Sequence, residues 1–188
     1  MDDLYIRDVL NGDIQAFKNL VKKYKDRAFN LSRSIVHSDL IAEESVQDAF
    51  IQAYRNLAGF KAKSAFSTWL YRIVVNESLK KIKKKKLHFI SIDDLSSDET
   101  IPAIRIEAIE HLHEEEQREI INEVLDNIRE TEALLLKLYY LEEKKINEIT
   151  EITGLSQSNC KVILYRARKN FAETYAKKVN QEQMYHGS

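Results

Sequence analysis

Residues that interrupt helices are scarce in this chain. One proline and four glycines occur among 188 residues, whereas leucine, isoleucine, alanine, lysine and glutamate are frequent. Proline and glycine end or weaken helices, whereas a composition rich in the five frequent residue types favours helix formation. The sequence therefore predicts an all-α fold.

The apolar residues follow the helical repeat, which places them on one face of each helix. In the first part of the chain we expect a short helix ending at Asn11-Gly12 and three longer ones. Because acidic side chains cap helix N-termini, Asp13 and Asp39 are expected to cap two of these, and Ser64 is expected to open the third. A second apolar set starts near Ile120, and further helices are expected over residues 130–141, 147–153 and 157–178.

The segment between these two parts has lost the helical repeat and contains the lone proline, Pro102, among several acids. Such a composition is typical of an extended linker. We therefore predict two small helical domains, at residues 1–86 and 107–188, joined by a flexible acidic linker at 87–106, with helicity resuming near Glu107.

The charges are segregated along the chain, although the formal net charge is only -1. Residues 1–86 contain 17 Lys and Arg against 10 Asp and Glu, a net charge of +7. Residues 87–123 contain 2 against 11, and residues 124–188 contain 10 against 9. The near-zero net charge of the whole chain is therefore the sum of a basic first part, an acidic middle and a nearly neutral end. The basic first part suits an acidic partner such as nucleic acid.

The sequence shows no pattern typical of a catalytic or metal-binding site. The five histidines do not form a helical metal-binding pair, and no glycine-rich phosphate loop occurs. The single cysteine, Cys160, excludes an internal disulfide and is expected to be a packed apolar residue. No run of 18 apolar residues or secretory leader pattern is present. We expect a cytoplasmic protein that is not an enzyme, without cofactor, metal or direct membrane insertion.

Residues 147–168 have the pattern of a helix-turn-helix. Gly154 lies where a helix must stop and turn, and Ser156 can cap the helix that follows. Cys160, Leu164 and Ala167 would line its buried side. The outward residues near its start, where a recognition helix meets base edges, are Gln157, Ser158, Asn159, Lys161, Val162 and Tyr165. Arg166, Arg168 and Lys169 lie further along and suit phosphate contacts. The alternative is an ordinary helical hairpin.

A second candidate for DNA contact is the expected helix from Ser64, which runs into six lysines within Lys80–Lys86. Arg72, Asn76, Lys80 and Lys83 recur on one side of it, opposite an apolar and aromatic side. Positive charge beside aromatic rings suits phosphates and unstacked bases. A solvated basic face or a nuclear-localisation signal would produce the same pattern.

Taken in order, these segments resemble the extracytoplasmic-function (ECF) sigma factors, the small bacterial initiation subunits of RNA polymerase in the sigma-70 family. The matching segments are GDIQAF at 12–17, AEESVQDAFIQAYRN at 42–56, SAFSTWLYRIVVN at 64–76 and SNCKVILYRAR at 158–168. The resemblance implies two helical domains, region 2 and region 4. It also implies promoter recognition and melting together with core RNA polymerase.

The resemblance assigns roles to individual residues. Glu44, Gln47 and Asp48 match positions that contact the clamp coiled coil of the largest polymerase subunit. Lys61, Ala62, Lys63 and Ser64 would surround an extruded base of the −10 element, while Arg72, Asn76, Lys80 and Lys83 hold the duplex edge. The helix-turn-helix would read the −35 element. Trp69 is expected to be packed rather than stacked on DNA.

The implied partners are core RNA polymerase, promoter DNA and an anti-sigma factor. One departure from the family pattern is Ile163, which stands where a basic residue is common and would reduce phosphate affinity. The main alternative function is a helix-turn-helix regulator that binds DNA without polymerase.

Overall fold

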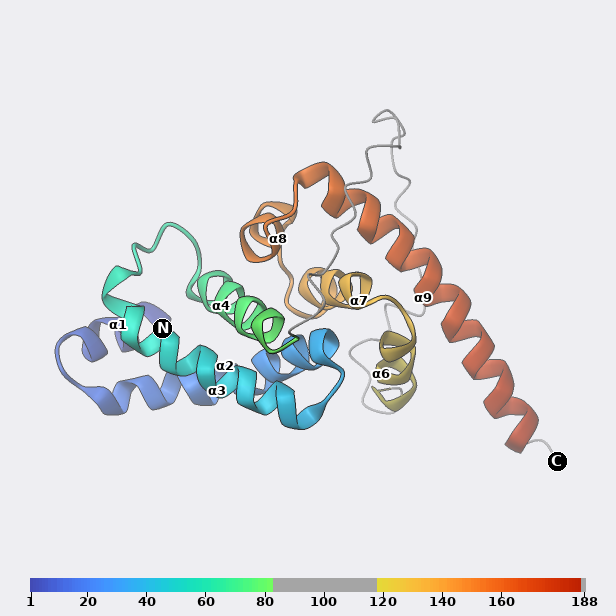
Figure 1. The fold of residues 1–188 in the computed structure, drawn as a ribbon, viewed down its shortest axis with the longest axis horizontal. Helices are drawn as coiled ribbons and strands as arrows, with labels where there is room; N and C mark the ends of the chain where they lie inside the picture. The colour runs from blue at the N-terminus through green and yellow to red at the C-terminus, as the bar shows by residue number, and fades with distance from the viewer. Residues whose placement is uncertain (83–117, 187–188) are drawn as a thin grey trace. The chain divides into compact units, whose positions relative to one another are not determined.

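The computed structural model describes residues 1–82 and 118–186, and within them the side chains of residues 1–82 and 120–179. The expected linker at 87–106, the helix start near Glu107 and Lys83 lie outside the described residues. Within the described ranges every regular element is helical (Figure 1). The chain divides into two compact units. The expected all-α fold is confirmed.

The first unit contains α1 (Asp2–Leu10), α2 (Ile14–Val36), α3 (Asp39–Asn56), the 3₁₀ turn η1 (Leu57–Gly59) and α4 (Phe66–Lys81). Helices α2, α3 and α4 pack against one another in pairs, and α1 packs on α2. Their buried apolar residues form one core: Phe17, Leu20, Tyr24, Ala28, Leu31, Ile35, Ala42, Val46, Ala49, Phe50, Ala53, Phe66, Leu70, Tyr71, Val74 and Val75.

The start of α2 follows the sequence prediction. The Asp13 carboxylate accepts a hydrogen bond from the Gln15 backbone N–H at 2.9 Å, which satisfies one of the free donors at the helix start. The helix ends at His37, whose φ of 52° lies in the left-handed region. These two features fix both ends of the longest helix in this unit.

The predicted cap at Asp39 and the predicted helix start at Ser64 are both wrong. Asp39 is the first residue of α3 and follows Ser38, which makes no side-chain cap bond. Its carboxylate instead accepts a hydrogen bond from Arg33 Nε of α2 at 2.5 Å. The side chain that was expected to cap α3 therefore binds the preceding helix. Helix α4 begins at Phe66, after Ala65, and not at Ser64. Ala65, which lies between Ser64 and Phe66, has an extended backbone with ψ of 146°, so the helix cannot include Ser64.

Helix α4 is buried on a wider face than its apolar stripe predicted. Ile73 and Trp69 are half-buried, whereas Tyr71 and Ser78 are fully buried. The Ser78 hydroxyl donates to Ser32 on α2 at 2.8 Å, so this polar pair within the core is hydrogen-bonded. The contact fixes the last turns of α4 against α2.

The second unit is built around α9 (Gln157–His186), a 30-residue helix. Before it come α6 (Arg118–Asn127), α7 (Glu130–Leu136), the π-helical turn η4 (Lys137–Leu141) and α8 (Ile146–Thr153). Helices α6 and α7 both pack on α9. The buried apolar residues include Ile121, Val124, Leu125, Leu134, Leu135, Leu138, Cys160, Leu164, Ala167 and Phe171.

Two predicted elements of this unit differ in extent. The helix expected over 130–141 consists of α7 followed by a π turn, which apolar spacing does not distinguish from an α-helix. Helix α9 continues to His186, beyond the expected end at 178, because no proline or glycine occurs between residues 157 and 186. Within this unit, Asn170 Nδ2 donates to the buried Glu132 carboxylate at 2.8 Å and links α9 to α7.

Candidate protein and nucleic-acid interfaces

The outer side of α3 carries a small acidic surface formed by Glu44, Gln47 and Asp48. The opposite side of the helix, with Ala42, Val46, Ala49 and Ala53, is buried in the core. Because positions three and four apart share a helix face, the fold holds these three polar side chains together at the surface. The side chains of Glu44 and Asp48 are 53% and 48% exposed. They are accessible to a partner, as the sequence predicted.

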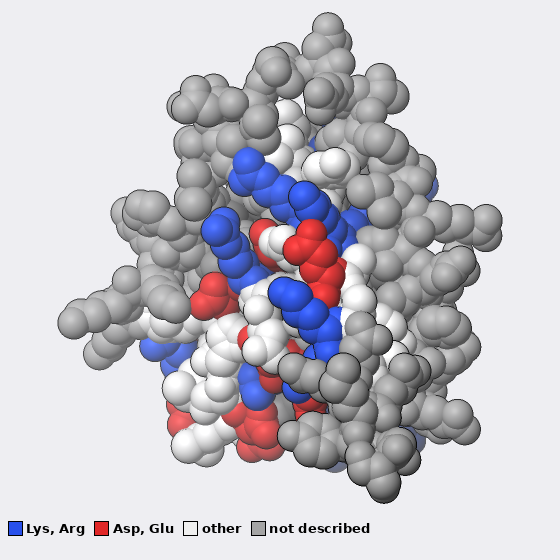
Figure 2. All heavy atoms as spheres, turned by 90° about the vertical axis from the view of Figure 1, so that its right-hand side faces the viewer, with Lys and Arg blue, Asp and Glu red and all other residues white. Residues whose placement is uncertain are grey.

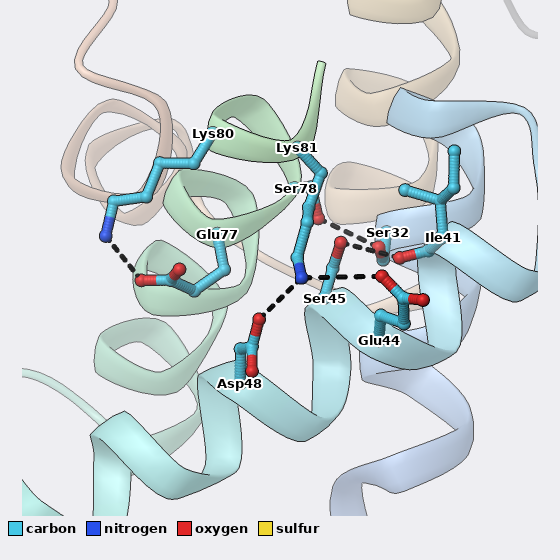
Figure 3. Close-up of polar contacts among 9 residues, drawn as sticks. All are labelled: Ser32, Ile41, Glu44, Ser45, Asp48, Glu77, Ser78, Lys80 and Lys81. Atoms are coloured by element: carbon cyan, nitrogen blue, oxygen red, sulfur yellow. Dashed lines mark hydrogen bonds and ion pairs between the residues drawn. The ribbon is translucent and has the colours of Figure 1, made fainter. Parts of the chain in front are cut away.

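Lys81, at the end of α4, lies across this acidic surface (Figure 3). Its Nζ is 2.8 Å from Asp48 Oδ2 and 3.5 Å from Glu44 Oε2. The hydrogen bond to Asp48 is the largest cause that raises the pKa of Lys81. This contact was not predicted from the sequence, because Lys81 is 37 residues from Glu44 and periodicity within one helix does not connect them.

The loop from Phe60 to Ser64 is bordered by three aromatic rings. The Phe60 and Trp69 ring centroids are 5.2 Å apart, and Phe66 lies 5.8 Å from Phe60 and 5.7 Å from Trp69. Trp69 is half-buried and packed in this cluster, as expected. The cluster fixes both ends of the loop.

Lys61, Ala62 and Lys63 form the exposed part of the same loop, and Ser64 is half-buried. The positive φ of Ala62 is unusual for a residue with a Cβ, and such backbone geometry persists only where the surroundings hold it. The fold therefore presents two lysines on a constrained turn next to an aromatic cluster.

The predicted basic side of α4 is exposed at Arg72, Asn76 and Lys80. Lys80 Nζ forms an ion pair with Glu77 Oε1 on its own helix at 2.7 Å (Figure 3). The Glu77 side chain is only 11% exposed, whereas that of Lys80 is 64% exposed. Lys80 is thus held along α4 with its charge largely open to solvent.

The turn between α8 and α9 has the expected construction. Gly154 adopts a φ of 76°, which favours glycine, and Ser156 Oγ accepts a hydrogen bond from the Asn159 N–H at 3.2 Å. Cys160, Leu164 and Ala167 form the buried side of α9, as expected. Of the proposed reading residues, Gln157, Ser158 and Lys161 are exposed, while Asn159, Val162 and Tyr165 are half-buried.

Two predicted DNA-contacting residues of α9 have partners within this unit. Gln157 Nε2 donates to Asn147 Oδ1 on α8 at 3.0 Å. Arg168 Nε donates to the Tyr140 hydroxyl at 2.6 Å, and its guanidinium lies 5.4 Å from the Tyr139 ring centroid. Both contacts join residues from different elements, so residue spacing alone could not indicate them.

The other basic residues of α9 differ in exposure. Lys169 is exposed and Arg166 is half-buried. Ile163 is 8% exposed and belongs to the core, so its packing role accounts for an apolar residue at this position. Figure 2 shows Lys and Arg side chains interspersed with Asp and Glu over the described part of one face. On that face the positive charge is not gathered into a single patch.

Residues 1–82 and 118–186 contain no group of three His, Cys, Asp or Glu residues placed to hold a metal ion. Over the same ranges, every helix is too short or too polar to cross a membrane.

Comparison with known families gives two matches in chain order. The family described as Sigma-70 region 2 matches residues 20–88, which include the acidic surface and α4. The family described as Sigma-70, region 4 matches residues 118–171, which include the helix-turn-helix. The matches correspond to the two helical units in the order that the resemblance implied.

Similar proteins cover nearly the whole chain. The ECF RNA polymerase sigma factor SigW of Bacillus subtilis is 30% identical over 170 residues, covering 87% of this chain and 91% of SigW. The ECF RNA polymerase sigma-E factor of Escherichia coli is 29% identical over 182 residues, covering 89% and 91%.

Two solved structures share the fold, each with a TM-score of 0.60. One is CnrH in complex with the cytosolic domain of CnrY, 18% identical and covering 90% of this chain and 94% of the other. The second is the sigma factor RpoE in complex with the anti-sigma factor NepR from Bartonella quintana, 19% identical and covering 86% and 97%. The extent and order of these similarities show that this chain belongs to the ECF RNA polymerase sigma factors of the sigma-70 family.

Proposed function

We propose that this alternative sigma factor docks on core RNA polymerase through α3, binds the −10 element through α4 and its preceding loop, and binds the −35 element through α9. The observation that supports this most directly is the separation of three exposed polar surfaces from two well-packed cores. Helices α3, α4 and α9 carry most of these contact residues and keep them in fixed positions relative to their own unit.

The polymerase-binding surface consists of Glu44, Gln47 and Asp48. Two carboxylates and an amide on a rigid helix suit a basic, helical partner such as the clamp coiled coil of the largest polymerase subunit. The carboxylates supply charge complementarity, and Gln47 can both donate and accept hydrogen bonds.

For the −10 element, Lys61, Ala62, Lys63 and Ser64 surround a base extruded from the non-template strand. Arg72, Asn76, Lys80 and Lys83 hold the adjacent backbone and duplex edge. Capture of a flipped base offsets the few kcal/mol needed to unstack it. Strand separation is then driven by binding, and the protein needs no catalytic group.

For the −35 element, the start of α9 enters the major groove. Its candidate contacts with base edges are Gln157, Ser158, Asn159, Lys161, Val162 and Tyr165, and its candidate phosphate contacts are Arg166, Arg168 and Lys169. Both promoter contacts belong to one chain. Once one is made, the other forms at a high effective concentration, so two weak contacts give one selective site.

We also infer a cytoplasmic location and regulation by an anti-sigma factor that covers these surfaces. The second inference draws on RpoE, whose structure was solved with the anti-sigma factor NepR. Because Glu44, Arg72 and Lys161, from the three proposed contact surfaces, are all exposed, one protein that covers these surfaces would block activity.

Footprinting on one promoter tests the proposal. The protein alone, core polymerase alone and the two together are compared by DNase I protection and by permanganate reactivity of unpaired thymines. We expect protection at both elements and a reactive −10 region only when both are present. Strong, sequence-specific protection by the protein alone would instead favour a stand-alone helix-turn-helix regulator.

A further inference from the structure

Lys81 occupies part of the surface that the proposed polymerase contact requires. Its Nζ lies 2.8 Å from Asp48 and 3.5 Å from Glu44, and both contacts join the end of α4 to α3 within one packed unit. Figure 3 shows the lysine reaching from α4 to the two carboxylates. An external cation would therefore meet carboxylates that already have a partner.

The same lysine belongs to the basic end of the helix assigned to the −10 element. Lys80 precedes it and pairs with Glu77 on α4 itself, whereas Lys81 pairs with the neighbouring helix. Neighbouring residues on a helix point about 100° apart, which explains their different partners. Of these two lysines, Lys81 thus connects the DNA-binding helix to the polymerase-binding helix.

The ion pair can be displaced at modest cost. The side chains of Glu44 and Asp48 are about half exposed and that of Lys81 is 32% exposed, so water competes for all three. Exposed pairs of this kind contribute little stability, and salt screens them. They can exchange partners without disturbing the core beneath.

We propose that Lys81 is an internal competitor for the polymerase-binding surface, and that its displacement couples polymerase docking to DNA binding. This inference rests on the proposed function. When a basic polymerase surface pairs with Asp48 and Glu44, Lys81 is released and adds one positive charge to the DNA-binding end of α4. When DNA phosphate draws Lys81 away first, the carboxylates become free for polymerase.

Because both partners must break the same contact, whichever binds first removes that cost for the second. Coupling of this kind is reciprocal: DNA must strengthen polymerase binding by the same factor as polymerase strengthens DNA binding. The exposed ion pair limits the factor to about two- to fivefold. The effect is large enough to measure and small enough to leave assembly reversible.

The test compares the full-length protein with its Lys81→Met and Lys81→Gln variants. Affinity for core polymerase is measured by fluorescence anisotropy at low salt, with and without a −10 non-template oligonucleotide. We expect the neutral variants to bind polymerase about two- to fivefold more tightly without DNA. We expect the oligonucleotide to increase their affinity by a smaller factor than it increases the wild-type affinity.

Lys23→Met is the matched control. Lys23 Nζ on α2 pairs with Asp2 Oδ1 on α1 at 2.6 Å, so this change also removes one lysine and one interhelical ion pair, but one that does not involve α3. It should bind core as the wild type does. Lys81→Arg keeps the charge and should also resemble the wild type. Circular dichroism shows which of the two neutral Lys81 variants retains the wild-type fold. The affinities of that variant decide the test.

The outcomes separate the two ideas. If the wild type does not bind core polymerase, the proposed function fails. If the wild type binds but the folded neutral variant binds no more tightly, the competitor role is wrong while the proposed function stands. Tighter binding by Lys23→Met to the same extent would show a general charge effect and would also overturn the inference.

Discussion

Reversing the charge of the acidic surface on α3 should abolish polymerase binding and leave the fold intact. In Glu44→Arg with Asp48→Arg, two negative charges become two positive ones at side chains that are 53% and 48% exposed. The buried apolar residues Ala42, Val46, Ala49 and Ala53 of α3 lie on its opposite side, so the core is unchanged. Arginine also favours helices.

The size of the effect follows from the number of charge pairs lost. Removing one partner of a close interfacial charge pair costs about 2 kcal/mol or more. Two such pairs correspond to about 4 kcal/mol, or a loss of affinity of roughly a thousandfold. Reversal adds repulsion toward a basic partner, so this figure is a lower bound. Within the free protein, Lys81 loses its two carboxylate partners, but these contacts are exposed to solvent.

Fluorescence anisotropy with labelled protein and purified core polymerase measures the affinity directly. The control is Asp3→Arg with Asp26→Arg, which makes the same change in charge at exposed residues of α1 and α2. It should bind core with nearly wild-type affinity. If the α3 variant keeps its helical circular dichroism and still binds like the control, the assignment of this surface is refuted.

Three further predictions concern other parts of the protein. Asn76→Ala should impair promoter opening more than initial docking, and normal permanganate reactivity at the −10 element would contradict the role of α4. Asn147→Leu removes the acceptor of the Gln157 amide and should lower discrimination at one −35 position about fivefold in a binding selection; an unchanged base preference would argue against it. Burial and the hydrogen bond to Asp2 raise the pKa of Tyr24 to about 12. Because this folded-state pKa lies above the ordinary value of 10.0, stability should hold below about pH 10 and fall as the pH rises toward 12. In urea unfolding, Tyr24→Phe should lose less stability over that interval, and an equal loss would contradict the assignment.

The features of the fold that depend on neighbouring residues were predictable from the sequence. Asp13 caps α2 because the cap bond closes within two residues, and Gly154 marks the turn before α9 because its φ of 76° favours glycine. The buried stripes of α2, α3 and α9 follow from the helical repeat.

The errors arise where distant residues compete with local preferences. Asp39 has the chemistry of a cap, but its carboxylate binds Arg33 of the preceding helix. Ser64 is a suitable cap residue, but the chain becomes helical only at Phe66, after the loop that contains Ala62. Propensities cannot weigh such tertiary contacts.

At the candidate interfaces, the contacts that the sequence did not predict also depend on how separate helices pack together. The positions of Glu44, Gln47 and Asp48 on one face follow from their spacing. The contact of Lys81 with two of them depends on how α4 packs on α3, and the contact of Arg168 with Tyr140 depends on how η4 lies against α9. Spacing within one helix contains no information about either pair.

Run-off transcription tests the central claim most directly. Purified core polymerase is incubated with a randomised promoter library, with and without this protein, and the transcript starts are sequenced. The account predicts new start sites that appear only with the protein and share two upstream elements at a fixed separation. The same start sites with and without the protein would contradict it.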